Sequence, residues 1–176
     1  MYPAIRMALA LWSGSRQPER DVNDTFESTH RVMPWDIDIF GELNNGTTLT
    51  LLDLNRLPFG GRVNWNQTLI KNGWMMTMAG VSVRYRRRIR AFQKIRITCK
   101  AVGRDDRFFY LVQTIYRGDE PTTQALYRVA VTNKKGMIPT QEMVEAMDEL
   151  DWNPEIPDWV AAWIAAEDLR PWPPET

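Results

Sequence analysis

The sequence contains very few of the side chains from which metal clusters and disulfides are built. Among its 176 residues there is one cysteine, Cys99, and one histidine, His30. A single cysteine cannot form a disulfide within the chain, and this usage favours a reducing compartment, so cytoplasmic residence is expected. Structural zinc sites need several cysteines and histidines, so no metal site is predicted.

Long apolar runs and an excess of one charge are also missing. No run approaches the ~18–20 residues of a membrane-spanning helix, so no membrane span is predicted. The run Met7–Trp12 is short beside the roughly 7–15 apolar residues of a signal-peptide core, so secretion is not expected. Lysine plus arginine and aspartate plus glutamate each total 22, giving zero formal net charge. This balance argues against general nucleic-acid binding.

The remaining composition is that of one ordinary globular domain. Apolar residues make up 44% and charged residues 25%, enough apolar surface for a core and too much for general disorder. We expect an N-terminal extension at 1–24, a main domain at 25–148 and a C-terminal tail at 149–176. The tail is rich in tryptophan and proline, and Trp159 and Trp163 are expected to dock a helix that ends near Leu169.

A polar loop followed by an apolar helix stands near the start of the main domain. Residues 25–33 are typical of a strand that ends at Pro34, and the loop 35–45 follows. Asn44 or Asn45 can cap the helix, because an amide oxygen accepts the unpaired N–H groups of a first turn. The helix that follows is apolar on most sides, which indicates a buried helix.

The expected end of this helix is set by residues that disfavour helical geometry. Pro58 and the pair Gly60-Gly61 are expected to stop it. A second, short helix is predicted at 65–71, closed by Gly73, and another at 140–147.

Beyond residue 80 the apolar pattern changes from helical spacing to alternation. Apolar and polar side chains alternate at 81–86, 94–101, 109–115 and 127–131. Short turn-forming segments join these runs, and such connections are typical of antiparallel neighbours. With the strand at 25–33 they predict an α+β fold, a five-stranded antiparallel sheet around one buried helix. The side chains just before them, Trp74, Met75, Met76 and Met78, are expected in the core, and the alternative is that they line an acyl channel, since methionine adapts to irregular apolar shapes.

The loop before the helix carries a recognisable pattern. Residues 36–45 read Asp-Ile-Asp-Ile-Phe-Gly-Glu-Leu-Asn-Asn, with Asp53 and Arg56 following in the helix. This order resembles the Asp-x-Asp-x-x-Gly-His-hydrophobic-Asn-Asn pattern of the hot-dog-fold thioesterase superfamily, in its 4-hydroxybenzoyl-CoA thioesterase-like branch, which includes acyl-CoA thioesterases. The resemblance runs from residue 25 to 135 and implies a hot-dog fold. Two positions depart from the pattern, since Glu42 replaces the histidine and Thr48 stands where many members have tyrosine.

The resemblance implies hydrolysis of an acyl-CoA or acyl-carrier-protein thioester, with coenzyme A as part of the substrate and no separate cofactor. Asp38 aligns with the family's catalytic aspartate, so we assign it the primary role as general base or nucleophile, assisted by Glu42. The unpaired amides at the helix start are expected to polarise the thioester carbonyl. The substrate-binding residues predicted here are Asn44, Asn45, Gly46 and Thr47. A purely structural alternative is that the loop serves only as a turn and helix cap.

An arginine-rich run at 84–90 is the strongest charge cluster in the sequence. It is either a solvated strand face or a site for the phosphates of coenzyme A, which guanidinium groups bind in a bidentate manner. We assign Arg86 and Arg88 to substrate binding. Asp53 and Arg56, three residues apart on one helix face, are expected to form an ion pair.

Two questions have alternative answers at this point: the oligomeric state, and whether the protein hydrolyses the thioester or only binds it. The resemblance implies a homodimer, or a dimer of dimers, with the pocket between subunits. The loss of the family histidine at Glu42 keeps open a non-hydrolytic acyl-CoA-binding protein on the same fold.

Overall fold

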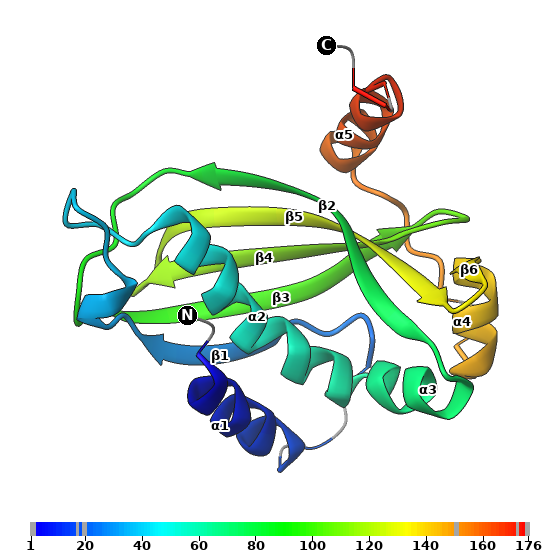
Figure 1. The fold of residues 1–176 in the computed structure, drawn as a ribbon, viewed down its shortest axis with the longest axis horizontal. Helices are drawn as coiled ribbons and strands as arrows, with labels where there is room; N and C mark the ends of the chain where they lie inside the picture. Colours follow the sequence, from blue (N-terminus) through cyan, green and yellow to red (C-terminus); the bar gives the residue numbers. More distant parts are fainter. Residues whose placement is uncertain (1–2, 17, 19–20, 150–151, 172, 175–176) are drawn as a thin grey trace.

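The structure is a computed structural model that describes residues 3–16, 18, 21–149, 152–171 and 173–174 (Figure 1). Its elements, in chain order, are α1 (Ala4–Ser15), β1 (Phe26–Arg31), the 3-10 turn η1 (Pro34–Asp36), α2 (Asn45–Arg62), α3 (Trp65–Asn72), β2 (Met75–Tyr85), β3 (Lys94–Arg104), β4 (Phe109–Arg117), β5 (Glu120–Asn133), β6 (Gly136–Ile138), α4 (Thr140–Ala146) and α5 (Asp158–Asp168).

One antiparallel sheet organises the molecule. Its strand order is β1-β3-β4-β5-β2, and β6 adds to β5 beside this path. The five predicted strands, four of them from alternation, are confirmed, but the sheet has a sixth. This strand escaped prediction because it is three residues long and shows no period. A tight turn forms it, in which the Asn133 side-chain oxygen accepts the Lys135 and Gly136 amides at 2.7 and 3.1 Å.

The long helix α2 packs on one face of this curved sheet, as expected for a hot-dog fold (Figure 1). Leu51, Leu52 and Leu54 of α2 are fully buried there against side chains of β1, β3, β4 and β5. Burial of side chains this size stabilises the fold by about 1.5–3 kcal/mol each. The prediction of a buried central helix is confirmed.

The predicted end of α2 was wrong. The helix runs through Pro58 and both glycines to Arg62, and the chain turns only at Asn64, whose φ is +61°. Proline removes one N–H from the helix, but Pro58 and Phe59 are buried, and this packing outweighs the local preference. A Cβ on Gly14 would lie 2.8 Å from the Pro58 Cβ, so α1 approaches α2 closely here.

The N-terminal extension and the tail both pack onto the main domain. Met7 of α1, Val22 and Trp152 belong to the same buried core as α2. Helix α5 packs on the other face of the sheet, where Val160 contacts a cluster of Phe108, Tyr110, Leu126 and Ala130. Trp163 is partly buried in this cluster, as predicted, whereas Trp159 is 48% exposed.

Strand β2 forms one edge of the sheet and is largely uncovered. Met75 is 64% exposed and Met78 41%, so the prediction that both lie in the core was wrong. Trp74 and Met76 do pack against the core. Alternation alone does not reveal whether a strand lies at an edge, because that depends on which strands become its neighbours. Among the described residues, no helix is long and apolar enough to cross a membrane.

Candidate functional site

The polar loop before α2 folds as a tight hairpin. Ile37 and Leu43 form an isolated antiparallel bridge, and the Asp38 amide donates to the Glu42 carbonyl at 2.9 Å. The Gly41 amide donates back to the Asp38 carbonyl at 3.1 Å, with a φ of +76° at Gly41. Glycine adopts that left-handed backbone without the steric cost of a Cβ.

Asp36 fastens this hairpin to the rest of the molecule. Its carboxylate is buried and accepts two hydrogen bonds from the Arg6 Nη1 atom, at 2.9 and 3.1 Å. It also accepts the Met33 amide at 2.9 Å. Sequence reasoning assigned Asp36 no role, because its partner lies in the N-terminal helix, 30 residues away.

Asp38 is engaged by its own hairpin. One of its oxygens, Oδ1, accepts the backbone amides of Phe40 at 2.8 Å and Glu42 at 3.3 Å. These bonds fix the backbone from which the Glu42 side chain projects. The Oδ2 atom of Asp38 has no hydrogen-bond partner within the part of the chain that the structure describes.

Asn44 caps α2, which confirms one of the two predicted caps. Its side-chain oxygen accepts the Thr47 amide at 3.1 Å, and its carbonyl accepts the Thr48 amide at 2.8 Å. The Thr48 bond is the first regular bond of the helix. Of the four amides that a helix start leaves unpaired, that of Thr47 is bound by the cap and that of Asn44 donates to the Asp36 carbonyl at 3.0 Å. The amides of Asn45 and Gly46 have no partner among the described residues. They therefore remain available to an oxygen atom of a ligand.

A cavity of about 380 Å³ opens beside this helix start. It brings together four of the eight predicted site residues, Glu42, Asn45, Arg86 and Arg88, with Thr48 and Tyr85 in its wall. The other four, Asp38, Asn44, Gly46 and Thr47, belong to the loop and first turn but do not line the cavity. The cavity thus joins a carboxylate, a helix start and guanidinium groups, although the arginines lie more than 40 residues further along the chain.

The arginines of the cavity differ in what they are already bound to. Arg88 pairs with Glu42, with 3.3 Å between Nε and Oε2, and its side chain is largely exposed. Arg87 pairs with Glu120 at 2.9 Å. Among the described residues, Arg86 has no ion-pair partner. Arg86 and, by exchange of partner, Arg88 can accept a new anion.

A second cavity, of about 210 Å³, lies further along α2 and is mostly apolar. Leu57, Trp65, Met76 and Met78 contribute to its walls, as do Asp53 and Arg56. These last two form the predicted ion pair. Burial raises the pKa of Asp53 above its ordinary value, and the Arg56 charge opposes this rise.

A buried chain of amide side chains crosses the core beneath Arg56. Gln113 accepts from Arg56 at 3.1 Å and donates to the Asn55 side-chain oxygen at 2.9 Å and the Leu52 carbonyl at 3.0 Å. Asn55 donates to Ser28 at 2.8 Å. Sequence reasoning missed this chain. A glutamine at an inward position of an apolar strand was its one available signal.

Comparisons with known proteins agree with this architecture. The profile of the Thioesterase-like superfamily matches residues 32–164. Protein THEM6 from Xenopus laevis is 28% identical over 167 residues, covering 93% of this chain and 79% of the relative. Protein THEM6 from Drosophila melanogaster is 27% identical over 169 residues, covering 94% of this chain and 86% of the relative.

Solved structures share the fold at lower identity. The probable thioesterase YbaW from Escherichia coli superimposes with a TM-score of 0.66 at 16% identity, covering 71% of this chain and 98% of that one. A 1,4-dihydroxy-2-naphthoyl-CoA thioesterase from Synechocystis gives 0.61 at 13% identity, covering 73% and 98%. The family profile spans most of the chain, from the polar loop into α5, and the chain therefore belongs to the thioesterase-like superfamily.

Proposed function

We propose that this protein hydrolyses acyl-CoA thioesters, with acyl-carrier-protein thioesters as the related alternative, at the N-terminus of α2. One observation carries the proposal: one cavity is lined by the Glu42 carboxylate, by Arg86, which has no ion-pair partner among the described residues, and by Asn45 at the start of α2, where the amides of Asn45 and its neighbour Gly46 have no described partner. Membership of the thioesterase-like superfamily supports the same reaction.

The electrophilic half of the reaction would use the amides of Asn45 and Gly46. A thioester carbonyl directed at them would gain two hydrogen bonds and the favourable end of the helix dipole as its oxygen becomes negative. Thr47 serves this arrangement indirectly, since its amide is bound by the Asn44 cap. A Cβ on Gly46 would lie 3.3 Å from the Asn44 oxygen, so glycine leaves room for the cap.

Activation of water would fall to the carboxylates of Glu42 and Asp38. Glu42 lines the cavity, so we assign it the contact with water or the thioester carbon. Asp38 either holds Glu42 through the hairpin amides or acts itself through Oδ2. In the unliganded chain Arg88 pairs with Glu42. A phosphate of coenzyme A that took Arg88 would release the Glu42 carboxylate to act as a base, coupling binding to activation.

The substrate would lie along α2. Arg86 and Arg88 would hold coenzyme A phosphates at the first cavity, and the second cavity would receive the acyl group between Met76 and Met78. Asn45 and Asp53, which line one cavity each, are separated by about 12 Å of helix rise. Met side chains adapt to irregular apolar groups, so this wall suits more than one acyl shape.

A homodimer, or a dimer of dimers, would complete this site. Strand β2 pairs with β5 on one side only, and its Met75, Met78, Val81 and Tyr85 side chains are substantially exposed. An exposed apolar edge strand is a template for pairing with a second strand. Two copies joined through β2 would cover both cavities, since residues of β2 line each of them.

A non-hydrolytic acyl-CoA-binding protein is the second candidate. The observation that favours it is the replacement of the family histidine by Glu42, whose carboxylate is held by Arg88. In that case the same cavity would bind acyl-CoA without releasing thiol.

A thiol-release assay on a panel of aliphatic and aromatic acyl-CoAs distinguishes the two candidates. We expect turnover in the natural chain and a loss of about 10²–10⁴-fold in kcat in Glu42→Gln and Asp38→Asn, the range for removing a general base. Asp119→Asn, an exposed turn residue, is the matched control and should keep full activity. Binding of acyl-CoA without thiol release across the panel would select the non-hydrolytic protein. Full activity in both carboxylate variants would remove the assignment.

A further inference from the structure

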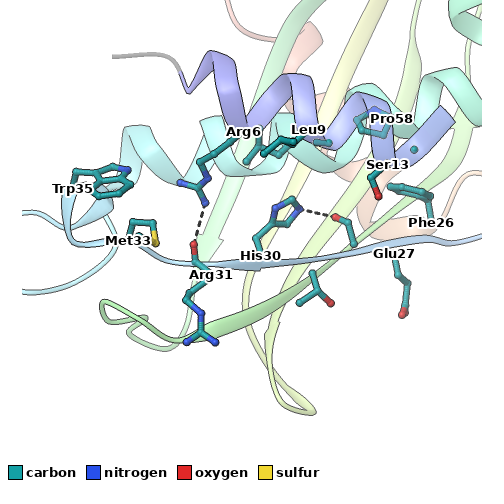
Figure 2. A pocket seen from close by; sticks show the side chains of 15 residues that line it. Arg6, Leu9, Ser13, Phe26, Glu27, His30, Arg31, Met33, Trp35 and Pro58 are labelled. Carbon is teal, nitrogen blue, oxygen red and sulfur yellow. Dashed lines mark hydrogen bonds between the residues drawn. The ribbon is translucent and has the colours of Figure 1, made fainter. Parts of the chain in front are cut away.

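A cavity of about 700 Å³ lies between α1 and β1, at the opposite edge of the sheet from the proposed thioester site. Figure 2 shows it from close by, with Arg6 and Leu9 of α1 facing His30 of β1. Arg6, Met33 and Trp35 lie toward one end, and Phe26, Pro58 and Ser13 toward the other. Its volume is within the usual range of small-molecule sites, about 300–1,000 Å³.

His30 can present a hydrogen-bond donor to this cavity. The Asn55 amide donates to the Ser28 hydroxyl oxygen, and this oxygen lies 2.8 Å from His30 Nε2. In the tautomer in which Ser28 donates to Nε2, the Nδ1 atom of His30 carries the hydrogen. Burial and the nearby Arg6 charge lower the pKa of His30 to about 4, so the ring is neutral at neutral pH. Within the described residues, Nδ1 has no partner.

Arg6 supplies further donors beside it. Two hydrogen bonds from Nη1 go to Asp36 and one from Nη2 to the Arg31 carbonyl. A guanidinium has five N–H donors, so two remain without a partner among the described residues. Despite the Asp36 pairing, the Arg6 charge still acts on His30 as a positive one.

Among the described residues that line the cavity, the acidic one is held elsewhere and does not take these donors. Glu27, its acidic lining residue, points to the other side of β1 in Figure 2 and pairs with Arg96 at 2.8 Å. The Arg31 side chain also points away (Figure 2) and donates to the Phe92 carbonyl at 2.8 Å. The cavity therefore combines unmatched N–H donors near Arg6 and His30 with apolar walls formed by Leu9, Phe26, Leu54 and Pro58.

We propose that this cavity is a binding site for an amphipathic carboxylate, a free fatty acid, separate from the site at the start of α2. The carboxylate accepts from Arg6 and from His30 Nδ1–H, and the hydrocarbon chain lies along Leu9, Phe26 and Pro58. The ligand belongs to the chemical class that thioester hydrolysis would release, but its binding here requires no hydrolysis and stands independently of the proposed function.

The single histidine makes a direct test possible, because the imidazole signals in an NMR spectrum of the full chain belong to His30 alone. Titration with dodecanoate should change the His30 signal saturably. Dodecanol, which keeps the chain without the charge, and acetate, which keeps the charge without the chain, should each bind at least about tenfold more weakly. No change with dodecanoate, or equal binding of dodecanoate and dodecanol, would overturn the proposal. Heat of binding without a change at His30 would place the ligand elsewhere and overturn it as well.

Variants test separately the hydrogen-bond donor of His30 and the apolar wall of the cavity. His30→Phe removes the N–H and should weaken dodecanoate binding about tenfold by calorimetry, while His30→Gln, which keeps an N–H donor, should recover part of the loss. Leu9→Glu adds a carboxylate to the cavity wall and should also weaken binding. Leu11→Glu, on the same helix but outside this cavity, is its matched control. Equal binding in Leu9→Glu and Leu11→Glu would contradict the site.

The Glu42→Gln variant keeps the two proposals apart. Dodecanoate should change its His30 signal as in the natural chain, whether or not thiol release is lost. Loss of the His30 response in Glu42→Gln would place the ligand at the α2 site and overturn this inference.

Discussion

The polar groups in the middle of helix α2 and those at its start differ in how many of their hydrogen-bond donors and acceptors are already paired. In the middle of the helix Asn55 is fully buried and, with Gln113 of β4, makes hydrogen bonds to α2, β1 and β3. At the helix start the amides of Asn45 and Gly46 have no partner in the part of the chain that the structure describes, and the Glu42–Arg88 pair is exposed to exchange. Satisfied buried groups hold elements together, whereas unsatisfied groups at a cavity are free for a ligand.

The largest expected effect on stability comes from breaking the buried chain of hydrogen-bonded amide side chains that contains Gln113 and Asn55. Gln113→Leu leaves the Asn55 oxygen without this partner and removes one hydrogen bond each from the Leu52 carbonyl and from Arg56, which keeps its ion pair with Asp53. We expect a loss of about 3 kcal/mol in the free energy of unfolding, measured by urea denaturation, because a buried group left unpaired costs about 1–3 kcal/mol and each further lost bond adds about 1 kcal/mol or less. Gln67→Leu, at an exposed position of α3, should change it by less than about 0.5 kcal/mol. Equal effects of Gln113→Leu and Gln67→Leu would mean that the hydrogen-bonded amide side chains contribute nothing to stability.

The next largest effect is on the pH dependence of stability. It arises at His30, beside Ser28 at the outer end of the same hydrogen-bond chain. Burial and the Arg6 charge lower the pKa of His30 from its ordinary value of 6.5 to about 4 in the folded state. Between these values only the unfolded state takes up a proton, so the stability present above pH 6.5 is lost as the pH falls toward 4. At pH 5 the loss is about 2 kcal/mol relative to pH 7.

This pH effect is isolated by comparing urea unfolding of the natural chain and His30→Gln at pH 7 and pH 5. The variant cannot protonate at this position, so the difference in unfolding free energy between the two chains should shrink by about 2 kcal/mol at pH 5. A constant difference would mean that His30 titrates alike in both states.

The smallest expected effect is at the open end of α2. Arg86→Ala should leave the unfolding free energy within about 0.5 kcal/mol of the natural value, because Arg86 is exposed. If Arg86 holds a phosphate, the KM for acyl-CoA should rise about tenfold, or the Kd if the protein only binds. Arg84→Ala is the matched control, since Arg84 is exposed two residues earlier, near the end of β2, but lines a different cavity with Trp159 and Trp163. A similar rise in both variants would indicate general attraction of charge.

Much of the fold could be predicted because it follows from local patterns. Alternation identified four strands, the segment before Pro34 identified a fifth, the run of leucines identified the buried helix, and Asn44 identified its start. The predicted stop at Pro58 failed because tertiary packing outweighed a local preference. The core placement of Met75 and Met78 failed because an apolar side chain does not report whether its strand lies at an edge.

The candidate site likewise has a part that the sequence predicted and a part that it could not predict. The loop pattern at 36–45 led to Glu42 and Asn45, and the arginine run led to Arg86 and Arg88. Which arginine is unpaired, and which amides the cap consumes, could not be predicted, because these depend on distances between side chains.

The sequence by itself determined the strands, the central helix, its cap and the family, because each depends on residue spacing within one segment. Only the tertiary structure decided that Arg6 fastens Asp36, that Gln113 binds Arg56, and that His30 faces a cavity under α1. The residues of the first two pairs lie 30 and 57 positions apart. Contacts at such separations form only after the chain has folded, when packing brings their elements together, so no local pattern records them.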